Sequence, residues 1–208
     1  MTESLGFQTI VADPPWEVTR TDGGCGVNQN KNHRPLEYPT MSIEAIGALD
    51  VQMIAHETSY LFIWTVQKYV ERTYMIARQW GFRPVTLLTW CKKPRGKGLG
   101  GQFGSTTEFI LYARRGSSAE MGRTRVHPST WFDWERGAHS VKPEAFQDMC
   151  EEKFPGPRLE MFARRKRQGW SVWGNEVECD VEIRAQDRDK RREEEEILDL
   201  YLSALGLL

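Results

Sequence analysis

The chain has 208 residues, of which 39% are hydrophobic and 27% are charged, and its formal net charge is −1. This length supports one domain with a substantial core and is short for two ordinary domains. No apolar run approaches the roughly 18 to 20 residues that a membrane span needs, and the N-terminus lacks the basic and apolar segments of a signal peptide. We therefore expect no membrane association and a cytoplasmic location.

The cysteines and histidines indicate whether disulfides or a metal site are expected, and the distribution of charge indicates the kind of partner. The four cysteines include no Cys-x-x-Cys pair, and the four histidines form no metal-ligand spacing with them. We therefore expect free thiols and no metal site. Basic residues exceed acidic ones before residue 176, and acidic residues exceed basic ones after it. A mildly basic body is compatible with a phosphate-bearing partner.

The first predicted element is a strand that ends at an unusual turn. A β-branched and apolar run, residues 9–12, leads into Asp13, Pro14, Pro15 and Trp16. The strand is expected to stop at Asp13, because neither proline has an N–H for a sheet ladder. In an open α/β sheet, ligands bind beyond the carboxyl ends of the strands, so Asp13 and Trp16 are expected to face a bound molecule. A solvated turn is the alternative.

This turn suits an enzyme that methylates an exocyclic amine. The amino group of adenine is a poor nucleophile because its lone pair is delocalised into the ring. If the Asp13 carboxylate accepts one N–H and the Pro14 carbonyl accepts the other, the nitrogen turns toward tetrahedral geometry. The rings of Pro14 and Pro15 fix φ near about −65° and hold that carbonyl still. Trp16 can stack on a base that is flipped out or single-stranded.

Asp13-Pro14-Pro15-Trp16 resembles the signature of a known family of methyltransferases. This is the family of the seventy-kilodalton catalytic subunit of mRNA N6-adenosine methyltransferase, which also includes bacterial and phage DNA adenine methyltransferases. The similarity covers residues 7–178. It implies the cofactor S-adenosyl-L-methionine and a Rossmann-like fold. Because only twelve residues precede Asp13, we expect the cofactor-binding half to follow it, as in the circularly permuted class.

A long loop and a helix come next. Residues 17–39 are rich in Gly, Asn, Asp and Thr, which predicts a functional loop. A helix that Ser42 can cap follows, with its apolar face reaching Ile54. The resemblance implies that Tyr38 lies near the cofactor and the target base. A tyrosine that packs the loop onto the helix is the alternative.

Strands and helices then alternate. Residues 60–66 form a continuous apolar run that is typical of a central parallel strand. Residues 68–80 are predicted to form a helix closed by Gly81, and residues 83–90 and 107–113 to form further strands. This alternation predicts an α/β protein with a mostly parallel sheet and helices on both faces.

The loop at 91–106 is basic and rich in glycine. Its Lys93 and Arg95 are expected to contact nucleic-acid phosphates, with Trp90 near the target base. A solvated, flexible loop is the alternative. The resemblance implies that Glu108, at the head of the next strand, stands close to the substrate pocket.

Residues 114–137 are predicted to form a second basic loop. Four arginines precede Trp131 and Trp134 in it, and such basic and aromatic interleaving is typical of segments that grip a nucleic-acid strand. A surface loop pinned by two tryptophans is the alternative.

Residues 139–143, His-Ser-Val-Lys-Pro, form the next constellation. Pro143 suits the first turn of a helix that runs to about Lys153, so Lys142 is expected at the helix entrance, facing the crevice. The resemblance identifies this as the second family motif. It implies that Lys142 pairs with the carboxylate of the methionine portion of the cofactor.

Two short strands complete the predicted cofactor half, one within residues 155–164 and one within residues 169–176. The resemblance implies cofactor contacts from Ala12, Asp13, Tyr38, Lys142, Phe162, Arg164, Arg165, Lys166, Arg167, Asn175 and Glu176. The amide of Asn175 and the carboxylate of Glu176 can grip ribose hydroxyls and an adenine edge. A solvated basic cluster is the alternative for residues 165–167.

The sequence thus predicts a catalytic domain at 1–180 and a charged tail at 181–208. The tail ends in an amphipathic helix that docks on its own domain or on a second copy. We predict an S-adenosylmethionine-dependent methyltransferase acting on the N6 amine of adenine in DNA, from a bacterium or phage. The alternatives are the same reaction on RNA, cytosine N4 transfer, or a non-catalytic nucleic-acid-binding subunit. A homodimer or a partner subunit is possible in each case.

Overall fold

The computed structural model describes most of the chain. The described residues are 6–17, 39–93, 103, 105–117, 129–135, 137 and 141–186. Tyr38, Arg95, most of the predicted loop at 17–39 and the predicted apolar helix of the tail lie outside these residues. No helix within the described ranges is long and apolar enough to cross a membrane.

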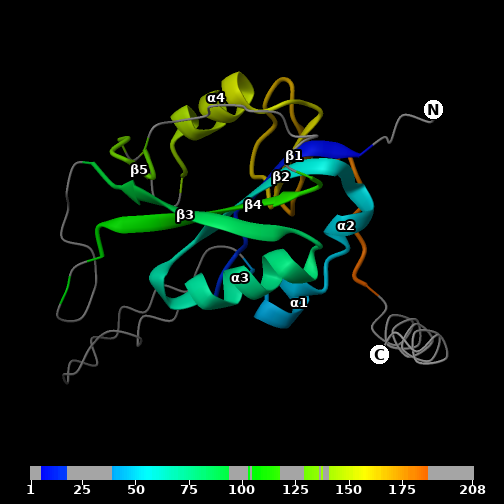
Figure 1. Ribbon diagram of the computed structural model, residues 1–208, viewed down its shortest axis with the longest axis horizontal. Helices are drawn as coiled ribbons and strands as arrows, with labels where there is room; N and C mark the ends of the chain where they lie inside the picture. The colour runs from blue at the N-terminus through cyan, green and yellow to red at the C-terminus, as the bar shows by residue number, and fades with distance from the viewer. Residues whose placement is uncertain are drawn as a thin grey trace.

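A seven-stranded sheet forms the centre of the fold, in the order β5-β3-β4-β2-β1-β6-β7 (Figure 1). The strands are β1 (Phe7–Ala12), β2 (Ala55–Thr65), β3 (Arg83–Cys91), β4 (Thr107–Arg115), β5 (Trp131–Phe132), β6 (Arg158–Met161) and β7 (Ser171–Trp173). β1 runs parallel to β2 and β6, β6 to β7, and β3 to β5. Among the strands of the described residues, only β4 runs antiparallel to both of its neighbours, β2 and β3. The predicted mostly parallel sheet is confirmed.

Helices cover both faces of this sheet, as predicted. They are α1 (Ile43–Gly47), α2 (Val51–Ile54), the 3-10 turn η1 (Gln67–Tyr69), α3 (Val70–Gln79) and α4 (Glu144–Lys153). The helices α1 and α3 pack on one face and α4 packs on the other (Figure 1). Gly81, with a φ of 81°, follows α3 and provides the predicted stop.

The helix predicted from Ser42 to Ile54 is divided into α1 and α2. Ser42 caps α1 through its side chain, as predicted. The helix ends at Gly47, because Leu49 leaves it to form an antiparallel β-bridge with Ala185. Ala185 lies far along the chain from Leu49, so this contact overrides the local helical pattern. The pattern of residues 42–54 gives no sign of the contact.

The predicted loop at 114–137 also needs a correction. It contains the end of β4 and the two-residue strand β5, which pairs with Thr89 and Trp90 of β3. Two residues are too few to show an alternating pattern, so the strand depends on its pairing partner and not on its own sequence.

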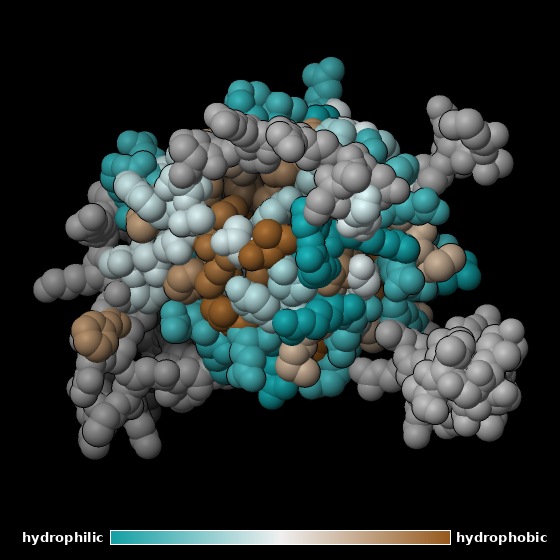
Figure 2. Space-filling model, viewed as in Figure 1, coloured by the Kyte–Doolittle hydropathy of each residue, from teal (hydrophilic) through white to brown (hydrophobic). Residues whose placement is uncertain are grey.

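The sheet divides the core into two layers. Ile10 packs with the cluster beneath α1 and α3, whereas the next residue, Val11, packs with the cluster beneath α4. In β2, Leu61 faces the first cluster, and Phe62 and Trp64 face the second. In Figure 2, apolar side chains gather in a hollow below α4, with hydrophilic side chains around it. Burial on both faces explains the continuous apolar run of β2.

The chain order places a topological switch point between β1 and β6. From β1 the chain continues to β2 on one side, and from β6 it continues to β7 on the other side. β1 and β6 are adjacent and parallel, so Asp13 and Phe162 follow their carboxyl ends at the same edge. In open α/β sheets, ligands bind at such a point.

Candidate active site

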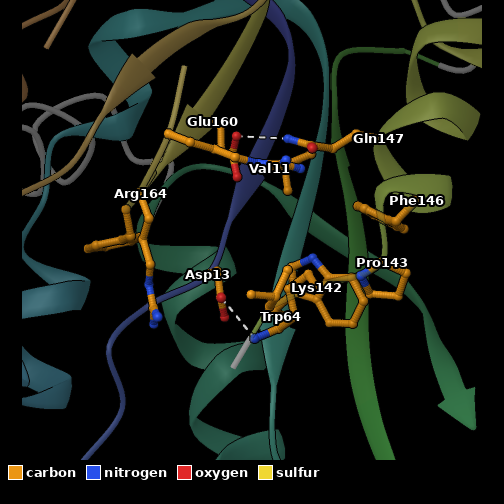
Figure 3. A pocket seen from close by; sticks show the side chains of 12 residues that line it. Val11, Asp13, Trp64, Lys142, Pro143, Phe146, Gln147, Glu160 and Arg164 are labelled. Atoms are coloured by element: carbon orange, nitrogen blue, oxygen red, sulfur yellow. Dashed lines mark hydrogen bonds and ion pairs between the residues drawn. The ribbon is translucent and has the colours of Figure 1, made fainter. Parts of the chain in front are cut away.

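A pocket of about 240 Å³ opens at this switch point. Its walls come from the carboxyl ends of β1, β2 and β6 and from the start of α4 (Figure 3). The residues that line it are Val11, Asp13, Trp64, Val141, Lys142, Pro143, Phe146, Gln147, Glu160, Phe162, Arg164 and Arg165. Five of the predicted cofactor residues are therefore brought together, namely Asp13, Lys142, Phe162, Arg164 and Arg165.

Asp13 and Lys142 form the central ion pair of the pocket. Lys142 donates a hydrogen bond from Nζ to Oδ2 of Asp13 at 2.8 Å (Figure 3). Lys142 precedes Pro143, whose φ of −60° leads into α4, so the lysine stands at the helix entrance and faces the crevice as predicted. Burial lowers the pKa of Lys142, but the carboxylates of Asp13 and Glu108 outweigh this effect and raise the pKa above its ordinary value. Lys142 is therefore a cation at neutral pH.

Glu108, near the start of β4, extends this ion pair. Its carboxylate lies 3.5 Å from Nζ of Lys142 and 2.5 Å from Nζ of Lys92. These three side chains are between 18% and 25% exposed, so solvent screens their charges only in part. Each ammonium also lies over an indole, Lys142 over Trp64 at 5.4 Å and Lys92 over Trp90 at 5.6 Å. The predicted position of Glu108 near the pocket agrees with this geometry.

Glu160 and Gln147 belong to the pocket, although the sequence reasoning missed them. Gln147 of α4 is 7% exposed, and its amide donates a hydrogen bond to Oε2 of Glu160 on β6 at 2.7 Å (Figure 3). Burial raises the pKa of Glu160 above its ordinary value, against the opposing effect of Gln147 and Arg165. The signal for Glu160 in the sequence is a carboxyl group between the apolar residues Leu159 and Met161 of a strand. Such a group in a pocket wall is a candidate for binding a cation.

The backbone at Phe162 is strained. Its φ of 63° lies in the left-handed region, which residues other than glycine rarely adopt. Two contacts hold the turn: Ala163 donates its N–H to the carbonyl of Trp173 at 3.0 Å, and the ring of Phe162 packs edge-on against that of Trp173. Gly174 lies so close that a Cβ there would be 2.2 Å from the carbonyl oxygen of Ala163. Strain of this kind is concentrated at binding sites.

Ion pairs connect the end of β6 with α4 and with the end of β7. Arg165 pairs with Glu144 of α4 at 2.6 Å, and Arg164 pairs with Glu176 at 3.7 Å. Glu176 and Asn175 are exposed and directly follow the strand β7 and Gly174. The structure therefore places Glu176 beside the pocket-lining Arg164, and Asn175 precedes Glu176 in the chain.

Lys166 and Arg167, for which cofactor contacts are predicted, do not line the pocket. Arg167 pairs with Glu151 at 2.6 Å and with Asp148 at 2.5 Å, both on α4. Lys166 pairs with Asp180 at 3.2 Å. The two side chains fasten the segment between β6 and β7 to its neighbours.

Trp16 and Trp90 do not line the pocket either, although both contact Trp64, which does. The ring of Trp16 is 5% exposed, stacks on Tyr69 at 5.1 Å and donates from Nε1 to the carbonyl of Trp64 at 3.0 Å. Trp90 is 2% exposed. Both indoles therefore serve the core, and Trp16 anchors its turn in place of the predicted stacking on a base. The carbonyl of Pro14 accepts a hydrogen bond from the N–H of Trp16 at 2.8 Å, which fixes its direction.

The fold and the pocket define a class of protein. A Rossmann-like sheet carries a pocket at its switch point, and acids and cations alternate around that pocket. This arrangement suits a small ligand with charges of both signs, or a nucleotide-like one. In the described part of the chain, no cluster of His, Cys, Asp and Glu could hold a metal ion, and Cys91, Cys150 and Cys179 are free.

Comparison with known proteins identifies the family. The MT-A70 family model matches residues 7–176, which is most of the chain. The chain belongs to the MT-A70 family and is a methyltransferase. The resemblance inferred from the turn at 13–16 is thereby confirmed.

Two relatives show how far this similarity extends. The type II methyltransferase M.MunI of a Mycoplasma species is 29% identical over 185 residues, covering 82% of this chain and 78% of that protein. The N(6)-adenosine-methyltransferase catalytic subunit METTL3 of Homo sapiens is 22% identical over 181 residues, covering 83% of this chain but 28% of that protein. The chain therefore spans only about a quarter of METTL3.

A third similarity is short and lies in a protein with a different description. A UPF0335 protein of Caulobacter vibrioides is 51% identical over 47 residues, covering 23% of this chain and 51% of that protein.

Proposed function

We propose that the protein transfers a methyl group from S-adenosyl-L-methionine to the exocyclic N6 amine of adenine in DNA. The observation that carries this proposal is the placement of Asp13 at the carboxyl end of β1, where its carboxylate lines the pocket and is held by Lys142. A fixed acceptor at this place is what an exocyclic amine needs in order to turn its lone pair toward a methyl donor.

The pocket residues fit the cofactor. The amino-acid part of S-adenosylmethionine carries an ammonium and a carboxylate. Glu160 offers a carboxylate that is kept in the pocket wall despite its desolvation, and it would hold the ammonium. Lys142 would hold the carboxylate, as the family resemblance implies. Asn175 and Glu176, beyond β7, offer an amide and a carboxylate for the ribose hydroxyls and the adenine edge.

The catalytic residues would act by orientation. S-adenosylmethionine, when bound, supplies an electrophilic methyl group on a sulfonium. Asp13 accepts one N–H of the adenine amine and the Pro14 carbonyl accepts the other. Lys142 contacts Oδ2 of Asp13, and we assign Oδ1 to the amine. Asp13 and the Pro14 carbonyl would hold the nitrogen lone pair toward that methyl group, and the methylated nitrogen would give up one proton to solvent.

DNA is the favoured polymer, and RNA is the alternative. M.MunI, whose name describes a type II methyltransferase, shares 78% of its length with this chain, whereas METTL3 shares 28%. Greater shared length favours the bacterial enzyme as the guide to the substrate. A cytoplasmic location is part of this proposal, because the bacterial chromosome and phage genomes lie there.

The direct test compares Asp13→Asn with the wild type in methyl transfer to an adenine-containing DNA oligonucleotide. The substitution keeps the size of the side chain but puts an amide where the anionic acceptor should be. We expect the rate to fall by roughly 100-fold or more, while calorimetry still detects cofactor binding. Glu71→Gln, on the exposed side of α3, is the control and should retain wild-type activity.

Two results would contradict the proposal. An Asp13→Asn enzyme that transfers at the wild-type rate would remove the proposed role of Asp13. A wild-type protein that binds the cofactor and DNA but transfers nothing would favour the alternative of a non-catalytic subunit.

A further inference from the structure

A second pocket, of about 290 Å³, lies at the carboxyl end of β3. The residues that line it are Cys91, Lys92, Lys93, Thr106, Trp131 and Asp133. It is separate from the active site but next to it, because Glu108 pairs with Lys92 of this pocket and with Lys142 of the first. One ion-paired carboxylate therefore stands between the two pockets.

Trp131 gives this pocket an exposed aromatic wall. Its side chain is 54% exposed, whereas the next residue on β5, Phe132, is 5% exposed and stacks on Trp134 at 4.3 Å between ring centroids. Phe132 faces the core, so the alternation of a strand turns Trp131 away from it. The indole of Trp131 thus presents a flat apolar face to solvent that the core packing does not use.

Cations stand beside this indole. Lys93 is 50% exposed and pairs with Asp133, which is 49% exposed. An ion pair this open to solvent contributes little, so an incoming phosphate can displace the carboxylate from Lys93. Lys92 adds a second ammonium to the lining of this pocket.

We propose that the second pocket binds the nucleotide next to the target adenine in the methylated DNA strand, with its base on Trp131 and its phosphate at Lys93. This inference rests on the proposed function. A free phosphate would use the cations but not the indole, and an apolar ligand would use the indole but not the cations. A nucleotide uses both. Glu108 pairs with Lys92 of this pocket and with Lys142, which contacts Asp13, so the nucleotide would lie near the amine that Asp13 is proposed to hold.

The test uses single-stranded DNA oligonucleotides that carry 2-aminopurine, whose fluorescence is quenched by stacking, beside a single adenine. We expect the wild-type protein to quench this fluorescence when it binds, and Trp131→Ala to lose the quenching and to bind about 10-fold more weakly or worse. Trp131→Phe should restore part of both. Met53→Ala, at a side chain that is 78% exposed on α2, is the control and should match the wild type.

The cations have their own readout in the same assay. Lys93→Gln should reduce the slope of log affinity against log salt concentration by about one, because one phosphate contact is lost. Asp133→Asn should bind at least as tightly as the wild type, because it frees Lys93. General unfolding would weaken DNA binding by both variants. A reduced salt slope in Lys93→Gln together with undiminished affinity in Asp133→Asn would therefore not arise from unfolding.

Failure of this inference can be told apart from failure of the proposed function. If wild-type binding causes no quenching, or if Trp131→Ala quenches and binds as the wild type does, the second pocket is not a nucleotide site, whatever the methylation result. If the wild type quenches but forms no methylated product from these oligonucleotides, the second pocket is still a nucleotide site, but the proposed reaction, and with it the position next to a target adenine, is wrong.

Discussion

Charged side chains of alternating sign form a line between the two pockets. Asp13 contacts Lys142, Lys142 contacts Glu108, and Glu108 contacts Lys92. Lys142 and Glu108 each have two partners of opposite charge, so neither is left uncompensated when a ligand takes one partner away. At the residue scale, this explains how Lys142 can bind a ligand carboxylate without abandoning all of its protein contacts.

Glu160 should lower the stability of the protein at neutral pH. Because burial raises its pKa, the folded protein binds a proton at this site more readily than the unfolded chain does. The free energy of unfolding therefore falls as the pH rises from the ordinary range of a carboxyl group through the raised pKa. Glu160→Gln removes this charge and keeps an acceptor for Gln147. We expect its Tm to exceed that of the wild type at pH 7 and to match it below about pH 4.

The same variant tests the cofactor role of Glu160. Losing a charge-assisted contact with the cofactor ammonium should weaken binding by roughly 10-fold or more in calorimetry. Glu57→Gln, at an exposed acid of β2, is the matched control. If Glu160→Gln were no more stable than the wild type at pH 7, the claim that burial of the charged Glu160 carboxylate destabilises the fold would be wrong. If it bound the cofactor with wild-type affinity, its assignment to the ammonium would be wrong.

At the scale of elements, the turn between β6 and β7 depends on one close backbone approach. Phe162 adopts its positive φ where Gly174 packs against the backbone of Ala163. The turn carries Phe162 and Arg164 into the pocket wall, and the residues after Gly174 are the predicted ribose-binding pair. The shape of this part of the site is thus set by the missing side chain at position 174.

Gly174→Ala should damage both stability and cofactor binding. Its Cβ would lie 2.2 Å from the carbonyl oxygen of Ala163, so β6 and β7 must separate to admit it. Gly169→Ala is the matched control, since Gly169 has a φ of 81° and no atom within 4 Å of an added Cβ. The control should lose roughly 1–2 kcal/mol of unfolding free energy from its backbone alone.

Denaturant titration and cofactor calorimetry on the two glycine variants provide the measurement. We expect Gly174→Ala to lose more unfolding free energy than Gly169→Ala and to be the only one of the two that binds the cofactor weakly. Equal losses in the two variants would show that the close approach does not shape the site.

Elements with a strong local pattern could be predicted from the sequence. The strand before Asp13, the continuous apolar run of β2 and the helix closed by Gly81 appear at the expected places. The division of the helix after Ser42 and the existence of β5 could not be predicted, because Ala185 and β3 determine them from far along the chain. Local propensity yields to such tertiary contacts.

At the scale of the whole molecule, the pocket joins two parts of the chain that lie far apart in sequence. Asp13 follows β1, whereas Lys142 lies just before α4 and Glu160 lies on β6, after five of the seven strands in chain order. The family motifs allowed Asp13 and Lys142 to be predicted as site residues. Gln147 and Glu160 could not be predicted together, because their hydrogen bond depends on how α4 packs across β6.

The burial of Trp16 and Trp90 marks the limit of reading aromatic residues from sequence. An indole next to a catalytic motif can stack on a ligand or fill the core, and only the packing of the folded chain decides between these roles. Here Tyr69 and the carbonyl of Trp64 hold Trp16 in the core, whereas Trp131 is left exposed.

The central claim concerns the atom that is methylated and the polymer that carries it. The most direct measurement is to incubate the protein with methyl-labelled S-adenosylmethionine and matched DNA and RNA oligonucleotides, and then to analyse the digested nucleosides by mass spectrometry. We predict labelled N6-methyldeoxyadenosine from the DNA. Labelled N6-methyladenosine from the RNA alone would keep the chemistry but overturn the assigned polymer. A methylated cytosine, or no labelled nucleoside from either polymer while the cofactor binds, would contradict the proposed reaction.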